Sequence, residues 1–223
     1  MNPATLPLLT QAVNGTQTAT VIEIFFLLSM LSLGPILLVT LTSFTRIVIV
    51  LSFLRQALGT QQSPSNQIII ALALFLSLYV MAPVWQQIES RAVIPYLQKQ
   101  MTPQKALAEA WTPLQSFLLR QTRKADVTLF VEMRKDNLGQ GDETAATVLI
   151  PAFLLSELKT AFQMAFLIYV PFLILDLVVA SVLMSLGMMF LPPVLVSLPF
   201  KLILFVLADG WNLLVGSLVR SFA

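Results

Sequence analysis

The sequence contains no cysteine and no histidine, and each absence removes a class of chemistry. Without cysteine the chain cannot form a disulfide bond or use a thiolate as a nucleophile. Without histidine it lacks the commonest general base, and zinc sites built from cysteine and histidine are excluded. The signatures of nucleotide-binding loops and of α/β-hydrolases are missing as well. From these absences we expect the protein to bind no metal ion and no cofactor.

Charge is also scarce, because only 11% of the 223 residues are charged and 57% are hydrophobic. An average soluble domain has about 25% charged residues, so this chain has too few polar groups to cover a water-exposed surface. The 13 basic and 11 acidic residues nearly cancel and form no basic block, so no nucleic-acid partner is expected. The excess of apolar residues predicts burial in a membrane or in contacts with other proteins.

Uncharged stretches divide the chain into four regions and predict an all-α membrane protein. Ile24 to Thr45 and Gln67 to Ile88 each hold 22 uncharged residues, enough for a helix to cross a bilayer core of about 30 Å. Gly34-Pro35 is expected to kink or break the first of them. The predicted regions are a polar N-terminal segment at 1–20, a helical hairpin at 21–88, a charged helical insert at 89–143 and a second hairpin at 144–223.

The insert at 89–143 carries eight of the basic and seven of the acidic residues, so we expect it to lie in water. Thr102-Pro103 and Thr112-Pro113 each resemble a helix start, with a capping hydroxyl followed by proline. Asp126 is expected to cap a further helix that runs through Arg134.

The second hairpin is expected to consist of a helix ending near Gly187 and a returning helix ending near Arg220, with a methionine-rich turn between them at 184–193.

Arg46 and Arg55 in short polar loops favour the cytoplasmic side for that end of the first hairpin. The N-terminus and the insert are therefore expected on the periplasmic side.

Seven charges interrupt otherwise apolar sequence: Arg46, Arg55, Glu157, Lys159, Asp176, Lys201 and Asp209. A charge at the centre of a bilayer costs at least about 2.5–3.5 kcal/mol, so each needs a partner or water. They form either a polar path or gate, or structural ion pairs with neighbouring subunits, or they lie outside lipid. Asp176 and Asp209 also allow an intramembrane aspartic dyad, although the glycine-flanked sequence of such proteases is missing.

Methionine side chains are unbranched and polarizable, so they can close a gap and reopen it without one rigid packing solution. Met184, Met188 and Met189, followed by Phe190, are therefore candidates for a compliant hydrophobic constriction. Filling of an ordinary core is the simpler interpretation of the same cluster.

Four segments carry a resemblance to a known family: LTSFTRIVIVLSFLRQALGT at 41–60, PAFLLSELKTAFQMAF at 151–166, PFLILDLVVASVLMSLGMMFLPP at 171–193 and LPFKLILFVLADGWNLLVGSL at 198–218. With them the chain resembles the FliP family of flagellar biosynthesis proteins and, more broadly, the equivalent subunits of virulence-type type III secretion systems. The long charged insert and the ALGT and ADGW contexts favour the flagellar type.

The resemblance implies a non-enzymatic subunit of the type III export gate in the bacterial inner membrane, at the flagellar basal body. It implies a homo-oligomer of five copies that forms a helical cone with FliQ-like and FliR-like subunits, next to FlhA-like and FlhB-like export components and rod proteins. Unfolded secreted flagellar proteins pass through the cone, and a methionine-rich loop from each copy closes it. Carried over to this sequence, that gasket falls on Met188 and Met189.

Two positions depart from the family pattern: Phe190 stands where a third methionine is common, and Ala165 where glycine is common. Family precursors usually carry a cleaved signal peptide, whereas residues 1–20 lack its basic start, so the chain resembles a mature form. A self-contained proton-coupled transporter, with Asp176 or Asp209 as the coupling carboxylate, is the alternative hypothesis. No internal repeat of the kind common in transporters is evident.

Overall fold

The computed structural model describes residues 25, 28–29, 32–60, 63–138, 145–188 and 190–222. The chain forms two compact units, Met1–Val39 and Thr40–Ala223. In the first unit, residues 32–39 are helical. The helix passes through Gly34-Pro35 and ends at Leu41, so the break expected at the proline is wrong. Proline at this place removes one backbone donor but leaves the other helical hydrogen bonds intact.

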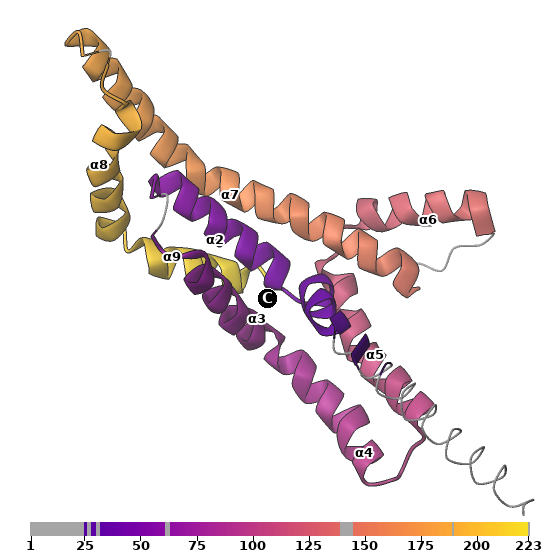
Figure 1. Cartoon of the computed structure of the whole chain (residues 1–223). Helices are drawn as coiled ribbons and strands as arrows, with labels where there is room; N and C mark the ends of the chain where they lie inside the picture. The colour runs from indigo at the N-terminus through magenta and orange to yellow at the C-terminus, as the bar shows by residue number, and fades with distance from the viewer. Residues whose placement is uncertain are drawn as a thin grey trace, which may run out of the picture. The chain divides into compact units, whose positions relative to one another are not determined.

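Every regular element of the described part of the second unit is helical, which confirms the all-α prediction. The elements are α2 (Phe44–Leu58), α3 (Asn66–Ile88), the π-helical segment η1 (Glu89–Val93), α4 (Ile94–Leu97), α5 (Pro103–Gln121), α6 (Lys124–Leu138), α7 (Ala146–Ser185), α8 (Pro193–Leu207) and α9 (Gly210–Arg220). In Figure 1, α2 runs alongside the middle of α7, and α9 brings the chain back to a C-terminus near the start of α2.

The first hairpin of this unit is made by α2 and α3. Gly59 ends α2 in the left-handed conformation, with φ at 76°, and its N–H donates to the Gln56 carbonyl at 3.0 Å. Ser65 begins α3, because its side chain accepts the Ile68 N–H. The main apolar core lies where α2 packs on α3, α7 and α9, and includes Ile47, Leu54, Ala73, Ala161 and Leu218.

The second apolar helix continues past the predicted boundary at residue 88. It passes through Pro83, changes to π-helical geometry at Glu89–Val93, and ends at Leu97. The whole stretch Asn66–Leu97 is 32 residues long. The first part of the charged insert is therefore an extension of a membrane-type helix.

Within the insert one predicted helix start is confirmed and two are wrong. Thr102 caps α5, and its hydroxyl accepts the Lys105 N–H. Thr112 lies inside α5, where its hydroxyl donates to the Ala108 carbonyl. Asp126 lies in the first turn of α6 and not before it. Its carboxylate binds α7 side chains instead, so tertiary partners have replaced the expected local cap.

The longest element is α7, which at 1.5 Å per residue extends about 60 Å and so is longer than a bilayer core is thick. The predicted end near Gly187 is confirmed, because α7 stops at Ser185. The returning helix differs from the prediction, since the chain bends by 64° between α8 and α9.

Among the described residues, two helices are long and apolar enough to cross a membrane, namely Asn66–Leu97 and Ala146–Ser185. The number rises to four if Ser32–Leu41 with Phe44–Leu58, and α8 with α9, each count as one broken span. The prediction of membrane-type helices is thus confirmed.

Candidate functional site

Arg46 and Glu157 form a buried ion pair that joins α2 to α7. Their side chains are 3% and 0% exposed. Arg46 Nε donates to Glu157 Oε2 at 2.9 Å, and Arg46 Nη2 donates to Oε1 of the same carboxylate. A two-point arginine–carboxylate contact fixes both the distance and the relative orientation of the two groups. The pair therefore holds the two helices in one register.

The same arginine also binds the C-terminal residues. Arg46 Nη1 donates to the Ser221 carbonyl and hydroxyl oxygens, both at 2.9 Å. The guanidinium carbon lies 3.8 Å from the centre of the Phe222 ring, within cation–π range. Gln121 completes the cluster by accepting from Arg46 Nη2 and donating to the Phe222 carbonyl. One cation thus brings α2, α5, α7 and the end of α9 together.

A second buried carboxylate, Asp126, fastens the insert to α7. It accepts from the Ser156 hydroxyl at 2.6 Å and from Lys159 Nζ. Burial by itself would raise the pKa of Asp126, but these two hydrogen bonds and the charges of Lys159 and Arg123 outweigh it, so the pKa lies below its usual value. The carboxylate is therefore ionised at neutral pH and acts as a structural anchor.

The third ion pair lies within the second hairpin. Lys201 Nζ on α8 donates to Asp176 Oδ2 on α7 at 2.7 Å, and the Ser197 hydroxyl donates to Asp176 Oδ1. Lys201 also donates to the Ala57 carbonyl at 3.1 Å, in the last turn of α2. A cation beside the final carbonyls of a helix is favoured by the helix dipole. Lys201 thus connects three helices.

The two remaining charges have other partners. Arg55, like Arg46, lies inside α2, so the short polar loops expected to hold these two residues are wrong. Arg55 donates to the Asn66 side chain and the Pro64 carbonyl. Asp209 accepts from the Asn212 side chain at 3.1 Å and is exposed. Asp176 and Asp209 are therefore each bound by different groups, and this arrangement does not make the shared-proton dyad of an aspartic protease. Among the described residues there is also no cluster of carboxylates that could hold a metal ion.

The methionine-rich turn joins α7 to α8 and projects apolar side chains into the surroundings. Phe190 is 99% exposed, Met184 61% and Met188 48%. Met189, the remaining predicted gasket residue, lies outside the described residues. Gly187 makes the turn possible by adopting φ of 72°, a conformation that other residues rarely take. These side chains do not fill the core of this chain.

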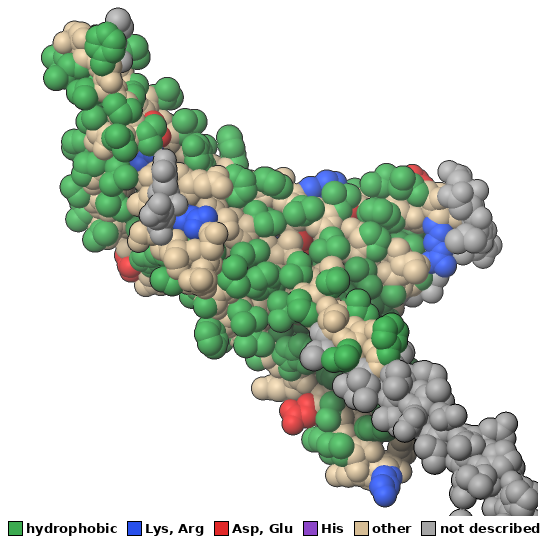
Figure 2. Space-filling view, in the orientation of Figure 1, with side chains coloured by type: hydrophobic (Ala, Val, Ile, Leu, Met, Phe, Trp, Pro, Cys, Tyr) green, Lys and Arg blue, Asp and Glu red, His purple; other side chains and the backbone are tan. Residues whose placement is uncertain are grey.

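Around this turn, exposed apolar side chains continue along both helices. Figure 2 shows hydrophobic side chains over much of the visible face of α7 and α8. Besides Met184, the large apolar residues at least 50% exposed on the two helices are Phe162, Phe166, Leu167, Ile174, Leu177, Val178, Val182, Leu195, Phe200, Ile203, Val206 and Leu207. A surface of this kind and size needs lipid or protein to cover it.

Sequence reasoning identified the charges but missed the groups that hold them. Ser197 and Ser221 were not singled out, nor was Asp126 recognised as the partner of Lys159. One signal was available: Ser197 precedes Lys201 by four residues, so both lie on one helix face. The others required the fold, because Arg46 and Ser221 are 175 positions apart.

Comparison with known proteins adds an independent finding. The model of the FliP family matches residues 27–218. The chain is 51% identical over 211 residues to the flagellar biosynthetic protein FliP of Pectobacterium carotovorum subsp. carotovorum, covering 94% of this chain and 82% of that protein. It is 48% identical to the Bacillus subtilis (strain 168) protein of the same name, covering 90% and 91%, and 48% identical to that of Aquifex aeolicus (strain VF5), covering 90% and 85%.

Proposed function

Because the chain belongs to the FliP family and so is a component of the flagellar export apparatus, we propose that it is a core subunit of the flagellar type III export gate. In this role it forms, with FliQ-like and FliR-like partners, the channel through which unfolded flagellar proteins leave the cell. It acts as a conduit and not as a catalyst.

The exposed apolar surface of α7 and α8 is the single observation that carries the channel proposal. The charges at Glu157, Asp176 and Lys201 interrupt these helices and are held by groups of the same chain, so the outward surface is left apolar. Large exposed apolar surfaces mark contacts with lipid or with other proteins, and in our proposal neighbouring subunits cover this one. Assembly of several copies, five by the family resemblance, would cover both helices.

The methionine-rich turn supports the gate. Its apolar side chains are exposed in the single chain, and when repeated around a symmetry axis they would meet and exclude water. Methionine at Met184 and Met188 keeps such a closure compliant, since the thioether side chain adapts to irregular gaps. We place the N-terminus and the insert at 89–143 on the periplasmic side of the inner membrane, next to rod proteins, with FlhA-like and FlhB-like components on the other side.

Replacement of the turn methionines tests this role. We expect Met188→Ala with Met189→Ala to increase ion leakage through the assembled gate, because two long side chains are lost from every copy. Leakage is measured by membrane conductance in cells, with Met133→Ala as control, since Met133 is 58% exposed on α6 and far in sequence from the turn. Unchanged leakage together with unchanged secretion would remove the gasket claim.

A further inference from the structure

The C-terminal part of α7, the methionine-rich turn and α8 form an arm, residues 172–207, in which few of the described side chains are buried. In α8 the buried residues are Ser197, Lys201 and Phe205, which follow one another at intervals of four. From residue 172 onward, α7 buries Phe172 and Leu183. Two of the three buried residues on α8 are polar; Ser197 bonds to Asp176 within the arm, whereas Lys201 also reaches α2.

At the base of the arm, α7 is continuous but contains Pro171, and the chain breaks between α8 and α9. On the α7 side Pro171 has no N–H to donate to the preceding turn, which weakens the helix there. On the α8 side the helix ends at Leu207, and α9 leaves it at 64°. Asp209, between the two helices, has a φ of 49°, which is a sparsely populated conformation for a residue with a side chain. Helix interruptions and terminal residues are where domain hinges usually lie.

Near the break between α8 and α9, Phe205 packs against two other aromatic rings. Its ring centre lies 6.5 Å from that of Phe172 and 5.4 Å from that of Trp211, which it meets edge to face. A Cβ atom added to Gly210 would come within 2.2 Å of the Phe205 ring. Because Gly210 has no side chain, the Phe205 ring can occupy this space, which is the seat of the ring.

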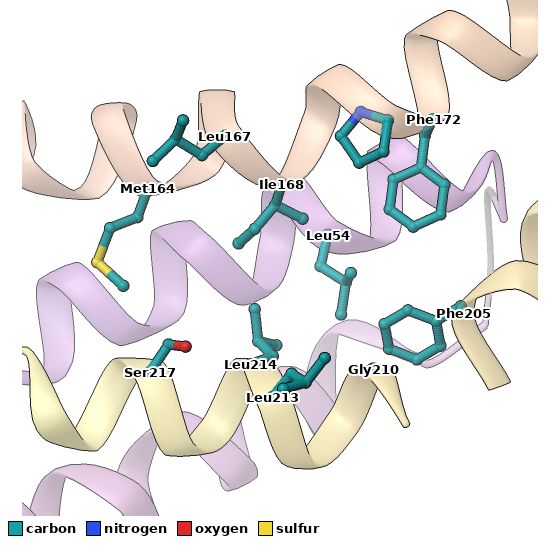
Figure 3. A pocket seen from close by; sticks show the side chains of 11 residues that line it. Leu54, Met164, Leu167, Ile168, Phe172, Phe205, Gly210, Leu213, Leu214 and Ser217 are labelled. Carbon is teal, nitrogen blue, oxygen red and sulfur yellow. The ribbon is translucent and has the colours of Figure 1, made fainter. Parts of the chain in front are cut away.

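A cavity of about 300 Å³ adjoins this seat. Figure 3 shows Phe172 and Phe205 at one end of it, with Ile168 and Leu54 further along and Gly210 below. The cavity is partly open to the surroundings, so the two phenyl rings are not enclosed by other side chains on that side.

Between the methionine-rich turn and Phe205, one hydrogen bond joins the arm to α2. Lys201 Nζ binds the Ala57 carbonyl and Asp176, and Val194 lies beside Gly59 at the end of α2. The bond to Asp176 lies within the arm, so the hydrogen bond to Ala57 and the contact with Gly59 are the ones that join this part of α8 to α2. At its base the arm also contributes Phe172 and Phe205 to the main apolar core.

We propose that the arm turns as one body about a hinge formed by Pro171 and by Asp209–Gly210, with Phe205 as the pivot and Lys201 as the latch to α2. Because the arm carries the methionine-rich turn, this rotation moves the turn relative to the body of the subunit. The statement that the rotation opens a channel rests on the proposed function; the rotation itself rests on the geometry above.

A disulfide across the latch tests the rotation, and the absence of native cysteine makes the result unambiguous. A Cβ atom at position 59 would lie 3.6 Å from Val194 Cγ1, so the two positions are neighbours, and Gly59→Cys with Val194→Cys is the pair to cross-link. Gly59 has a φ of 76°, so the single variant Gly59→Cys also measures the effect of the strained backbone. We expect an added oxidant to cross-link the pair and stop secretion of flagellar proteins in cells, and a reductant to restore it. Each single variant serves as a control and should respond to neither reagent.

The outcomes separate the two proposals. If secretion continues at full rate with the pair fully cross-linked, the arm does not turn and the inference is overturned, while the channel role stands. If removal of the whole chain leaves secretion unchanged, the proposed function fails instead.

A second measurement covers the case in which the double variant is inactive even when reduced. Spin labels at Gln56 on α2 and Leu195 on α8 report the position of the arm in the purified complex. Gly210→Ala should shift their distance distribution, because the added methyl group displaces Phe205 from its seat. Gly216→Ala on the same helix meets the mobile end of Arg220 and should leave the distances unchanged. An unchanged distribution in Gly210→Ala would contradict the pivot.

Discussion

Few charges interrupt this apolar chain, and those bound in pairs act as cross-links between helices distant in sequence. Arg46 and Glu157 are 111 positions apart, Lys159 and Asp126 are 33 apart, and Lys201 and Asp176 are 25 apart. The sequence predicted which charges need partners, since an isolated charge in apolar surroundings is costly. It left the pairing open, because partner choice depends on which helices pack together.

Glu157 provides the sharpest residue-scale prediction. Its replacement by leucine leaves the Arg46 charge buried without a carboxylate, and loss of one partner from a buried pair costs about 3–5 kcal/mol. We expect a correspondingly lower free energy of unfolding for Glu157→Leu, measured by denaturant titration in detergent. Glu132→Leu, at an exposed position on α6, should change it little.

Replacing both partners separates the cost of leaving the Arg46 charge unpaired from the cost of losing the ion pair itself. Arg46→Met combined with Glu157→Leu removes the orphan charge, so the double variant should regain much of the stability lost by Glu157→Leu alone. A double variant less stable than the single one would show that Arg46 acts mainly through Ser221 and Phe222.

Asp126 leads to a prediction on pH. Its pKa in the folded protein lies below the ordinary value of 3.8, so its stabilising contribution is complete above that value and is lost as pH falls through the folded pKa. The difference in unfolding free energy between wild type and Asp126→Asn should therefore be largest near neutral pH and shrink in acid below pH 3.8. A constant difference across that range would contradict the ionised anchor.

At the scale of elements, the described helices are longer and less interrupted than the positions of the prolines in the sequence predict. Pro35, Pro83, Pro113 and Pro171 all lie inside helices. In the described part of the chain the predicted spans break elsewhere, between Leu41 and Phe44 and between α8 and α9. In apolar surroundings the backbone has few alternatives to helical hydrogen bonding, so a proline costs one bond without ending the helix. The hairpins could be predicted from uncharged windows, whereas the bend at Asp209 could not.

Two threonines in α5 test the corrected helix start. Thr102→Ala removes the capping hydroxyl from the Lys105 N–H and should destabilise the helix by about 1 kcal/mol. Thr112→Ala changes an exposed position inside the helix and should be neutral or slightly stabilising, since alanine is the better helix former. Hydrogen exchange of the α5 amides measures both. Equal destabilisation of α5 by the two variants would contradict a helix start at Thr102.

At the scale of the whole molecule, we propose that the hydrophobic composition serves mainly as an assembly surface. Composition alone predicted a membrane protein, and the resemblance in four segments predicted the family that the comparisons then showed. Which apolar residues face outward followed only from the structure, because α7 is apolar along nearly its whole length and its sequence marks no single face.

The channel proposal requires that several copies cover one another's α7 and α8 surfaces. Native mass spectrometry of the detergent-extracted complex measures this directly. We predict a particle that contains several copies of the 24.7 kDa chain, five by the family resemblance, and that stays together when lipid is removed. A stable, monodisperse monomer that transports a small solute by itself would contradict the account and favour a self-contained transporter.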